Sequence, residues 1–76
     1  MILPSKHGGI DRSLLVLGAH LLELLEDPQE LGVLWQEVRD SRLVHSFDRF
    51  YQSVILLNVL GAIDVQDGLL VRLQRQ

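Results

Sequence analysis

The chain has no cysteine and few basic side chains. Without cysteine it can form no disulfide and offers no thiolate to a metal ion, which is typical of a cytosolic protein. Seven Lys and Arg residues stand against ten Asp and Glu residues, giving a net charge of −3 at pH 7. That is the wrong sign for a protein held on DNA mainly through phosphate contacts.

Long apolar runs are also absent. The uninterrupted apolar stretches extend over a few residues, far below the roughly 20 that a membrane-spanning helix needs. Met1 is not followed by a basic segment that leads into an apolar run and a small-residue cleavage site. There are no repeats and no low-complexity tracts, so the sequence predicts one small soluble domain in the cytoplasm.

What the chain has in excess is apolar side chains. They make up 47% of its residues, and the mean hydropathy is +0.20. A chain of this length buries only roughly 60 to 65% of the surface that its unfolded form exposes. Either the core is unusually well filled, or one face stays apolar because another chain covers it. We favour the second explanation.

The last third of the chain has the clearest structural pattern. Residues 46–60 form a helix-like run that ends at Gly61, and a hairpin follows with strands at 62–65 and 69–73. The turn of this hairpin is Gln66-Asp67-Gly68. Asp-Gly between two aliphatic runs is a strong hairpin signal, because the glycine supplies the positive φ that the turn needs.

A first helix is expected over residues 13–25. Its leucines at positions 14, 17, 21, 22, 24 and 25 share one broad face. Gly18 lies beside that face. It either lets a neighbouring helix approach closely or is a tolerated glycine in the helix interior, which costs about 1 kcal/mol relative to alanine.

The start of the second helix has two interpretations. It begins at Pro28, with Asp27 as the cap and Glu30 closing a capping box, or it begins near Leu31 after a short extended link. In both cases the inward stripe of this helix consists of Leu31, Leu34, Trp35 and Val38.

The third helix follows a loop at residues 41–45, and Ser46 caps it. Its core face is expected to consist of Phe47, Phe50, Tyr51, Val54 and Leu57. A second apolar patch on the same helix consists of Ile55, Leu56 and Val59. In a small fold such a patch either packs against the hairpin or is an interface.

Three helices followed by a hairpin is the order of a winged helix-turn-helix, so the predicted fold class is α+β, mostly α. We expect the winged-helix domain over residues 11–73, an extended amino-terminal arm at 1–10, and a tail at 74–76. Winged helices bind nucleic acid or proteins and seldom catalyse reactions, although a fold alone does not settle function.

The sequence contains no catalytic or metal-binding pattern. His7, His20 and His45 lie in three different segments and lack the spacing of metal ligands. The serines lack a nucleophile-elbow context, and there is no glycine-rich phosphate loop. We therefore expect a protein that is not an enzyme and that has no cofactor and no metal site.

The alternative function is that of a small DNA-binding regulator, acting as a homodimer. In a winged helix the third helix enters the major groove, and its exposed positions here are expected to be Asp48, Arg49, Gln52 and Ser53. The nucleic-acid candidates are Arg49, Gln52 and Arg72. They are a weak set, because a specific complex buries roughly 1,000 Å² or more of strongly basic surface.

Short motifs along nearly the whole chain together resemble a known family. In chain order they are Ile2-Leu3-Pro4-Ser5-Lys6-His7, Asp11-Arg12-Ser13-Leu14-Leu15, Gly18-Ala19, Leu34-Trp35, Ser46-Phe47-Asp48, Leu60-Gly61-Ala62-Ile63 and Asp67-Gly68-Leu69. This ordered set resembles the small middle component, type six, of bacterial ABC-three-component systems. The chain departs from the family pattern at Gly8-Gly9 in the arm and at Glu30-Leu31-Gly32 at the entry to the second helix.

The resemblance implies an adaptor that performs no chemistry itself. Such systems pair an ABC-type, SMC-like ATPase with a separate effector protein, and they defend bacteria against phage or plasmids. The partners implied are that ATPase and that effector, with nucleic-acid contact at most indirect or weak and with no membrane. The partner-binding residues are then expected in the arm and in the apolar patch, at Ile2, Leu3, Lys6, His7, Ile55, Leu56 and Val59.

Overall fold

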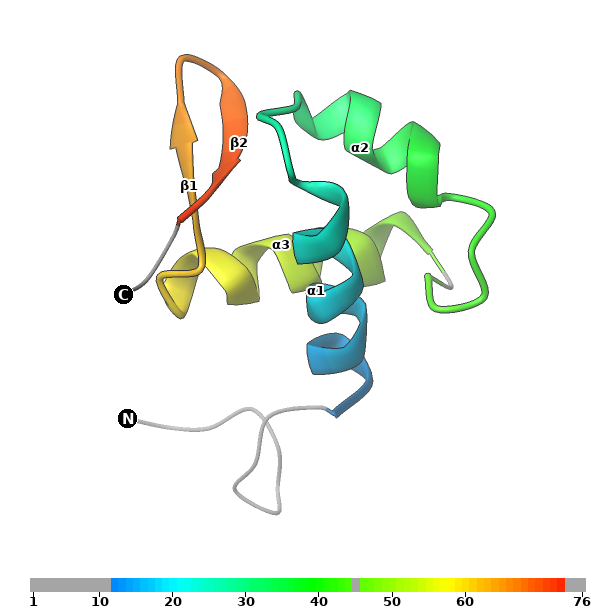
Figure 1. Ribbon diagram of the computed structural model, residues 1–76. Helices are drawn as coiled ribbons and strands as arrows, with labels where there is room; N and C mark the ends of the chain where they lie inside the picture. The colour runs from blue at the N-terminus through cyan, green and yellow to red at the C-terminus, as the bar shows by residue number, and fades with distance from the viewer. Residues whose placement is uncertain (1–11, 45, 74–76) are drawn as a thin grey trace.

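The computed structural model describes residues 12–44 and 46–73. Three helices come first, α1 at Arg12–Leu24, α2 at Leu31–Val38 and α3 at Phe47–Val59. Two antiparallel strands follow, β1 at Ile63–Gln66 and β2 at Leu69–Arg72. This order confirms the predicted fold class, a mostly helical α+β layout of the winged-helix kind (Figure 1). The expected arm at 1–10 and tail at 74–76 lie outside the described residues.

One hydrophobic core joins all five elements. It is built from leucines, valines, isoleucine and phenylalanine that recur at helical spacing on each helix and point inward from each strand. Its members are Leu17, Leu21, Leu25, Leu34, Val38, Val44, Phe50, Val54, Leu57, Ile63 and Leu70. The leucine face predicted for the first helix is therefore real, with its outer members Leu22 and Leu24 packed against the edge of this core.

α1 packs across α3 at Gly18 (Figure 1). A Cβ atom added to Gly18 would lie 3.1 Å from Leu57 Cδ2 and 3.3 Å from Ser53 Oγ, which is tighter than ordinary van der Waals contact. Ser53 is fully buried there, and its Oγ donates a hydrogen bond to the Leu14 carbonyl at 3.1 Å. Of the two interpretations of Gly18, the close approach of a neighbouring helix is the correct one. The prediction that Ser53 is exposed was wrong.

The second helix begins at Leu31, and the interpretation that starts it at Pro28 was wrong. Glu30 is its N-cap, with φ −69° and ψ 149° and with no hydrogen bond from the side chain to the helix. The physical reason lies in Gln29, whose backbone exchanges two hydrogen bonds with Leu70 of β2, at 3.2 and 2.7 Å. A residue paired in this way is extended, so the helix cannot include it.

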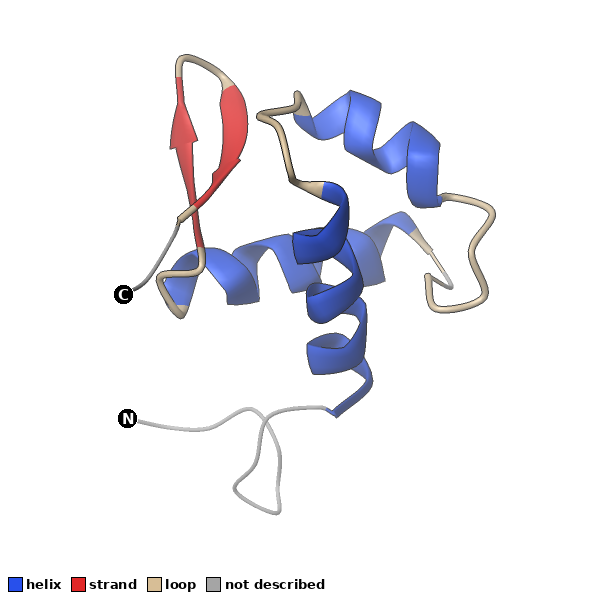
Figure 2. Cartoon of the chain, in the orientation of Figure 1, coloured by secondary structure: helices blue, strands red, loops and turns tan. Residues whose placement is uncertain are grey.

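The hairpin forms as the Asp-Gly signal predicts (Figure 2). Asp67 and Gly68 both have positive φ, 55° and 80°, the requirement of a two-residue type I′ turn. Gly61, with φ 79°, ends α3: the Gly61 N–H donates to the Asn58 carbonyl, and the Ala62 N–H donates to the Leu57 carbonyl. These two bonds form a Schellman cap, which turns the chain out of the helix and into β1.

The aromatic side chains of α3 correct one part of the predicted core face. Phe50 is buried as expected, but Phe47 and Tyr51 are both nearly half exposed. The core side of α3 is centred on Phe50, Ser53, Val54 and Leu57. Phe47 and Tyr51 are turned about 60° and 100° from Phe50 around the helix, so they lie at the edge of that side. Ser46 caps the helix as predicted, since its Oγ accepts the Arg49 N–H at 3.2 Å.

The contact at Gly18 predicts different outcomes for equivalent glycine substitutions. Gly32→Ala should raise the free energy of unfolding by about 0.5 kcal/mol, because nothing lies within 4 Å of the added Cβ and alanine favours the helix. Gly18→Ala should raise the free energy of unfolding by less than Gly32→Ala does. Gly18→Leu should lower it by about 1 to 3 kcal/mol, because the larger side chain overpacks against Leu57. Urea denaturation measures all three values. A Gly18→Leu protein as stable as the wild type would contradict the close contact between α1 and α3.

Candidate functional site

An open groove of about 430 Å³ lies where α3, the hairpin and the first residue of α2 meet. Its lining is mostly apolar. It consists of Leu31 from α2, Tyr51, Val54, Ile55, Asn58 and Val59 from α3, and Val65, Gly68 and Leu70 from the hairpin and its turn. The volume is in the range of small-molecule and peptide-anchor sites.

An exposed apolar stripe on α3, which we call the α3 stripe, forms one wall of this groove from Tyr51 to Val59. Its members Phe47, Tyr51, Ile55 and Val59 recur every four residues and are 44%, 46%, 47% and 76% exposed. Residues four apart lie one above the other on a helix, so the stripe runs the full length of α3, about 18 Å. A helix needs only one buried face, and α3 already has one in Phe50, so the stripe is a second, unsatisfied face.

The amino-terminal end of the α3 stripe is held in place by aromatic contacts. The Phe47 and Tyr51 rings stack, with centroids 6.0 Å apart and planes 12° apart. The Trp35 ring of α2 meets the Phe47 ring edge-on at 5.1 Å. Such pairs contribute roughly 0.5 to 1.5 kcal/mol beyond their buried area. This end of the surface is therefore already ordered before anything binds to it.

The predicted partner-binding residues of α3 divide into two groups. Ile55 and Val59 line the groove, and both are exposed. Leu56 is half-buried and is not part of the groove lining, because one residue along a helix turns the side chain by about 100°. Ile2, Leu3, Lys6 and His7, which were predicted in the arm, lie outside the described residues.

Both arginines among the nucleic-acid candidates contact α1. The Arg49 guanidinium donates to Ser13 Oγ at the start of α1, and Arg72 Nη1 donates to the Leu22 carbonyl near its end, at 3.1 Å. These two contact points are nine residues apart, about 14 Å along the helix. Gln52 is exposed on α3. The structure therefore does not bring the three candidates together on one surface.

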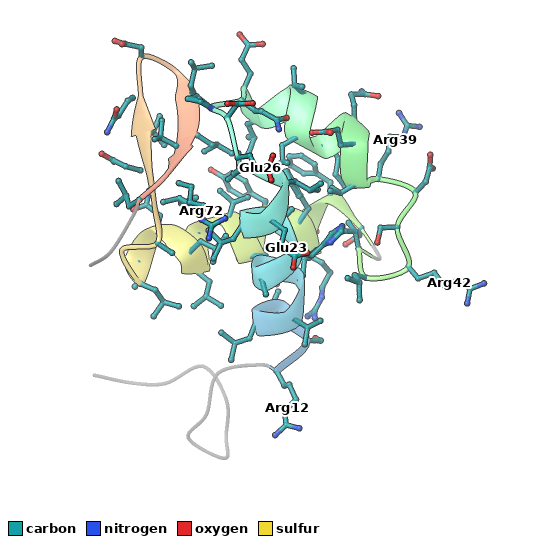
Figure 3. The ribbon with its side chains drawn as sticks, viewed as in Figure 1. Arg12, Glu23, Glu26, Arg39, Arg42 and Arg72 are labelled. Carbon is teal, nitrogen blue, oxygen red and sulfur yellow. The ribbon has the colours of Figure 1, made fainter. Side chains whose placement is uncertain are left out.

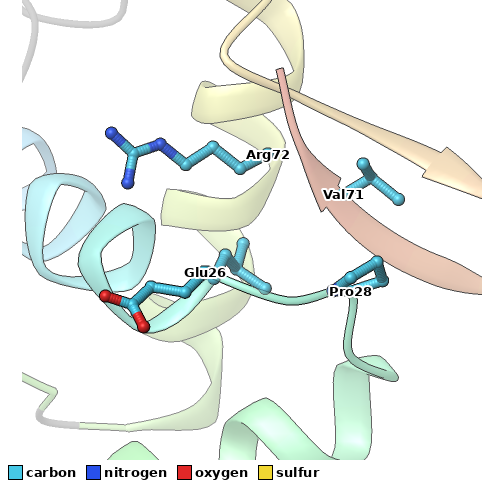
Figure 4. Close-up of a pocket in the computed structure, with 5 residues that line it drawn as sticks. Glu26, Pro28, Val71 and Arg72 are labelled. Atoms are coloured by element: carbon cyan, nitrogen blue, oxygen red, sulfur yellow. The ribbon is translucent and has the colours of Figure 1, made fainter. Parts of the chain in front are cut away.

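Arg72 also borders a second, smaller hollow of about 240 Å³, which the sequence did not indicate (Figure 4). Leu25, Glu26, Pro28 and Val71 line it as well. The guanidinium of Arg72 satisfies a carbonyl in the last turn of α1, where a positive charge is favoured by the helix dipole. The hydrogen bond of Arg72 is thus part of the fold.

The charged side chains are spread around the molecule. Figure 3 shows Arg12 at the start of α1, Arg39 and Arg42 where α2 leads into the next loop, and Glu23 and Glu26 around the end of α1. Within residues 12–44 and 46–73, no three His, Asp or Glu side chains gather in a way that could hold a metal ion. None of the helices in the same two ranges is long and apolar enough to cross a membrane.

Sequence reasoning missed the aromatic part of the candidate site. Phe47 and Tyr51 were assigned to the core, whereas they form the first half of the α3 stripe. The signal was present, because four apolar residues at steps of four are a complete helix face by themselves. It was ambiguous because Phe50, Val54 and Leu57 make a second such face on the same helix.

Comparison with known proteins gives one match. The family model for the ABC-three component (ABC-3C) system Middle Component 6 matches residues 3–74, nearly the whole chain. Neither a curated protein nor a solved structure matches.

The placement of Arg49 predicts a structural role for its side chain. Arg49→Ala should lower the free energy of unfolding by about 1 kcal/mol, because the hydrogen bond that joins α3 to Ser13 of α1 is lost. Arg42→Ala, at an exposed arginine of the loop after α2, is the matched control and should stay within about 0.5 kcal/mol of the wild type. Urea denaturation followed by circular dichroism measures both. Equal stability of Arg49→Ala and Arg42→Ala would refute the assignment.

Proposed function

We propose that this chain, which belongs to the Middle Component 6 family of ABC-three-component systems, acts there as a non-catalytic adaptor subunit in the cytoplasm. Its partners would be the ABC-type ATPase and the effector protein of the same defence system against phage or plasmids. The mechanism would be stoichiometric binding, in which the small subunit contacts the two larger proteins and holds them together.

The observation that carries this proposal is the α3 stripe beside its groove. A chain of this size has a core that already includes residues from every helix and both strands. Of the apolar side chains that remain outside, Tyr51, Ile55 and Val59 of α3 line one depression together with Val65 of β1. Contiguous exposed apolar surface of this kind is typical of a protein-binding face.

The charge of the same face argues against the DNA-binding alternative. A helix that reads the major groove presents basic and amide side chains to bases and phosphates. Here α3 presents Asp48 and Gln52 together with the α3 stripe, while Arg49 turns toward α1. A DNA-binding regulator would need cations at the positions that the stripe occupies.

A co-purification experiment tests the proposal. The chain is co-expressed with the products of its neighbouring genes, and the complex is isolated through a tag on this chain. We expect the wild type to retain the ATPase, the effector or both. We expect Ile55→Asp to weaken capture by more than about 30-fold, the loss typical of a central interface residue, because it places a charge in the groove.

Val16→Asp on α1 is the matched control. Val16 and Ile55 are each 47% exposed, but only Ile55 lines the groove. Both variants should keep the helical circular dichroism of the wild type, and Val16→Asp should still capture the partners. The adaptor proposal fails if the wild type captures neither protein, or if it instead shifts duplex DNA at low salt with the steep salt dependence of phosphate binding.

A further inference from the structure

We infer that the groove beside α3 receives an amphipathic helix of a partner protein, one whose apolar stripe is flanked by lysine or arginine. This inference rests on the proposed function, because it names the chemistry of the segment that the adaptor binds. It is carried by three features of the groove: its length and lining, the charge of its edges, and the paired edge of β2.

The length and lining of the groove suit a helix. The part of α3 that lines the groove, Tyr51 to Val59, extends for about 12 Å, which corresponds to about two turns of a helix laid alongside it. Leu31 and Val65 also line the depression, so apolar side chains from one face of such a helix can enter it. Amphipathic helices bind in such grooves through apolar anchor residues that recur every three or four positions.

The edges of the groove are acidic. Glu30 precedes the lining residue Leu31, and Asp67 precedes the lining residue Gly68. Asp48 lies seven residues before Ile55, which places both on the same side of α3. All three carboxylates are exposed.

The described arginines lie elsewhere. Arg49 and Arg72 are hydrogen bonded to α1. Arg39 and Arg42 lie at and beyond the other end of α2 from Leu31, and Arg12 lies at the start of α1 (Figure 3). An apolar groove with acidic edges favours an occupant with basic edges and disfavours an acidic one. A second copy of this chain would bring the same carboxylates against one another, and their like charges would repel.

The edge of β2 beside the groove is already paired at Leu70. The outward N–H and carbonyl of Leu70 in β2 are both bonded to Gln29. On the other strand, the Val65 N–H donates to Asp64 Oδ1 at 2.8 Å. A partner that added a strand to the sheet would have to break these bonds. Beside Leu31 and Leu70, recognition therefore has to use side chains, as a helix laid in the groove does.

The test uses the full chain and two model peptides of about 14 residues, or four turns. One peptide places leucine at helical spacing with lysine at all other positions, and the other replaces lysine with glutamate. Trp35 reports binding by its fluorescence, because its ring contacts Phe47 of the α3 stripe and the peptides contain no tryptophan. We expect the leucine–lysine peptide to bind at least tenfold more tightly than the leucine–glutamate peptide.

Variants locate the binding site. Ile55→Asp should abolish binding of the leucine–lysine peptide, although it adds a negative charge that would strengthen purely electrostatic association. The double variant Glu30→Lys, Asp67→Lys should reduce the preference for lysine over glutamate at least tenfold. Glu37→Lys with Asp40→Lys, at exposed positions that do not line the groove, is the matched control and should leave the preference unchanged.

Each outcome decides the inference. Equal affinity for the two peptides, or binding that survives Ile55→Asp, overturns it. Dimerisation in sedimentation velocity that Ile55→Asp abolishes also overturns it, because the occupant is then a second copy. If partner capture depends on Ile55 while the peptides show no charge preference, the adaptor function stands and this inference falls. If the leucine–lysine peptide binds in the groove but no neighbouring gene product is captured, the groove chemistry stands and the adaptor function falls.

Discussion

The close approach of α1 and α3 is the contact on which the rest of the structure depends. Gly18 has no side chain, so Leu57 and the Ser53 hydroxyl lie against the backbone of α1. This contact buries one side of α3 against the middle of α1. The opposite side is then left to the hairpin and to α2, which are too small to cover it. The exposed apolar stripe is therefore a consequence of how the first two long helices pack.

A small domain gains from such an arrangement only if another molecule completes it. The free energy that holds 76 residues together is the small difference between apolar burial and lost conformational entropy. Apolar side chains left in water contribute nothing to that difference. On the adaptor proposal, the α3 stripe would supply binding energy that folding does not use, and aromatic packing of Trp35 against Phe47 orders one end of it. Order of this kind before binding lowers the entropic cost of association.

The sequence predicted the elements better than it predicted the site. The Asp67-Gly68 turn and the Ser46 cap rest on local chemistry, so short stretches of sequence were sufficient to place them. The start of α2 was not decided by local chemistry, because a capping box and an extended link fit the same residues. The pairing of Gln29 with Leu70, 41 positions away, decided it.

The division of α3 into two faces could not be read from its sequence. Helical spacing places Phe47 and Tyr51 between the side of Phe50, Val54 and Leu57 and the side of Ile55 and Val59. It does not show which side α1 covers. That choice depends on Gly18, which lies on a different helix. The family resemblance was recognisable because it depends on the order of motifs, and the matched residues 3–74 confirm it.

The reciprocal bonds between Gln29 and Leu70 have an evolutionary consequence. They join the segment before α2 to the hairpin through main-chain atoms, at 2.7 and 3.2 Å, directly beside Leu31. The spacing between those two walls is thus set by atoms that every amino acid except proline shares. Mutation can exchange the side chains on the walls, and so adapt the surface to a diverging partner, while the frame that carries them persists.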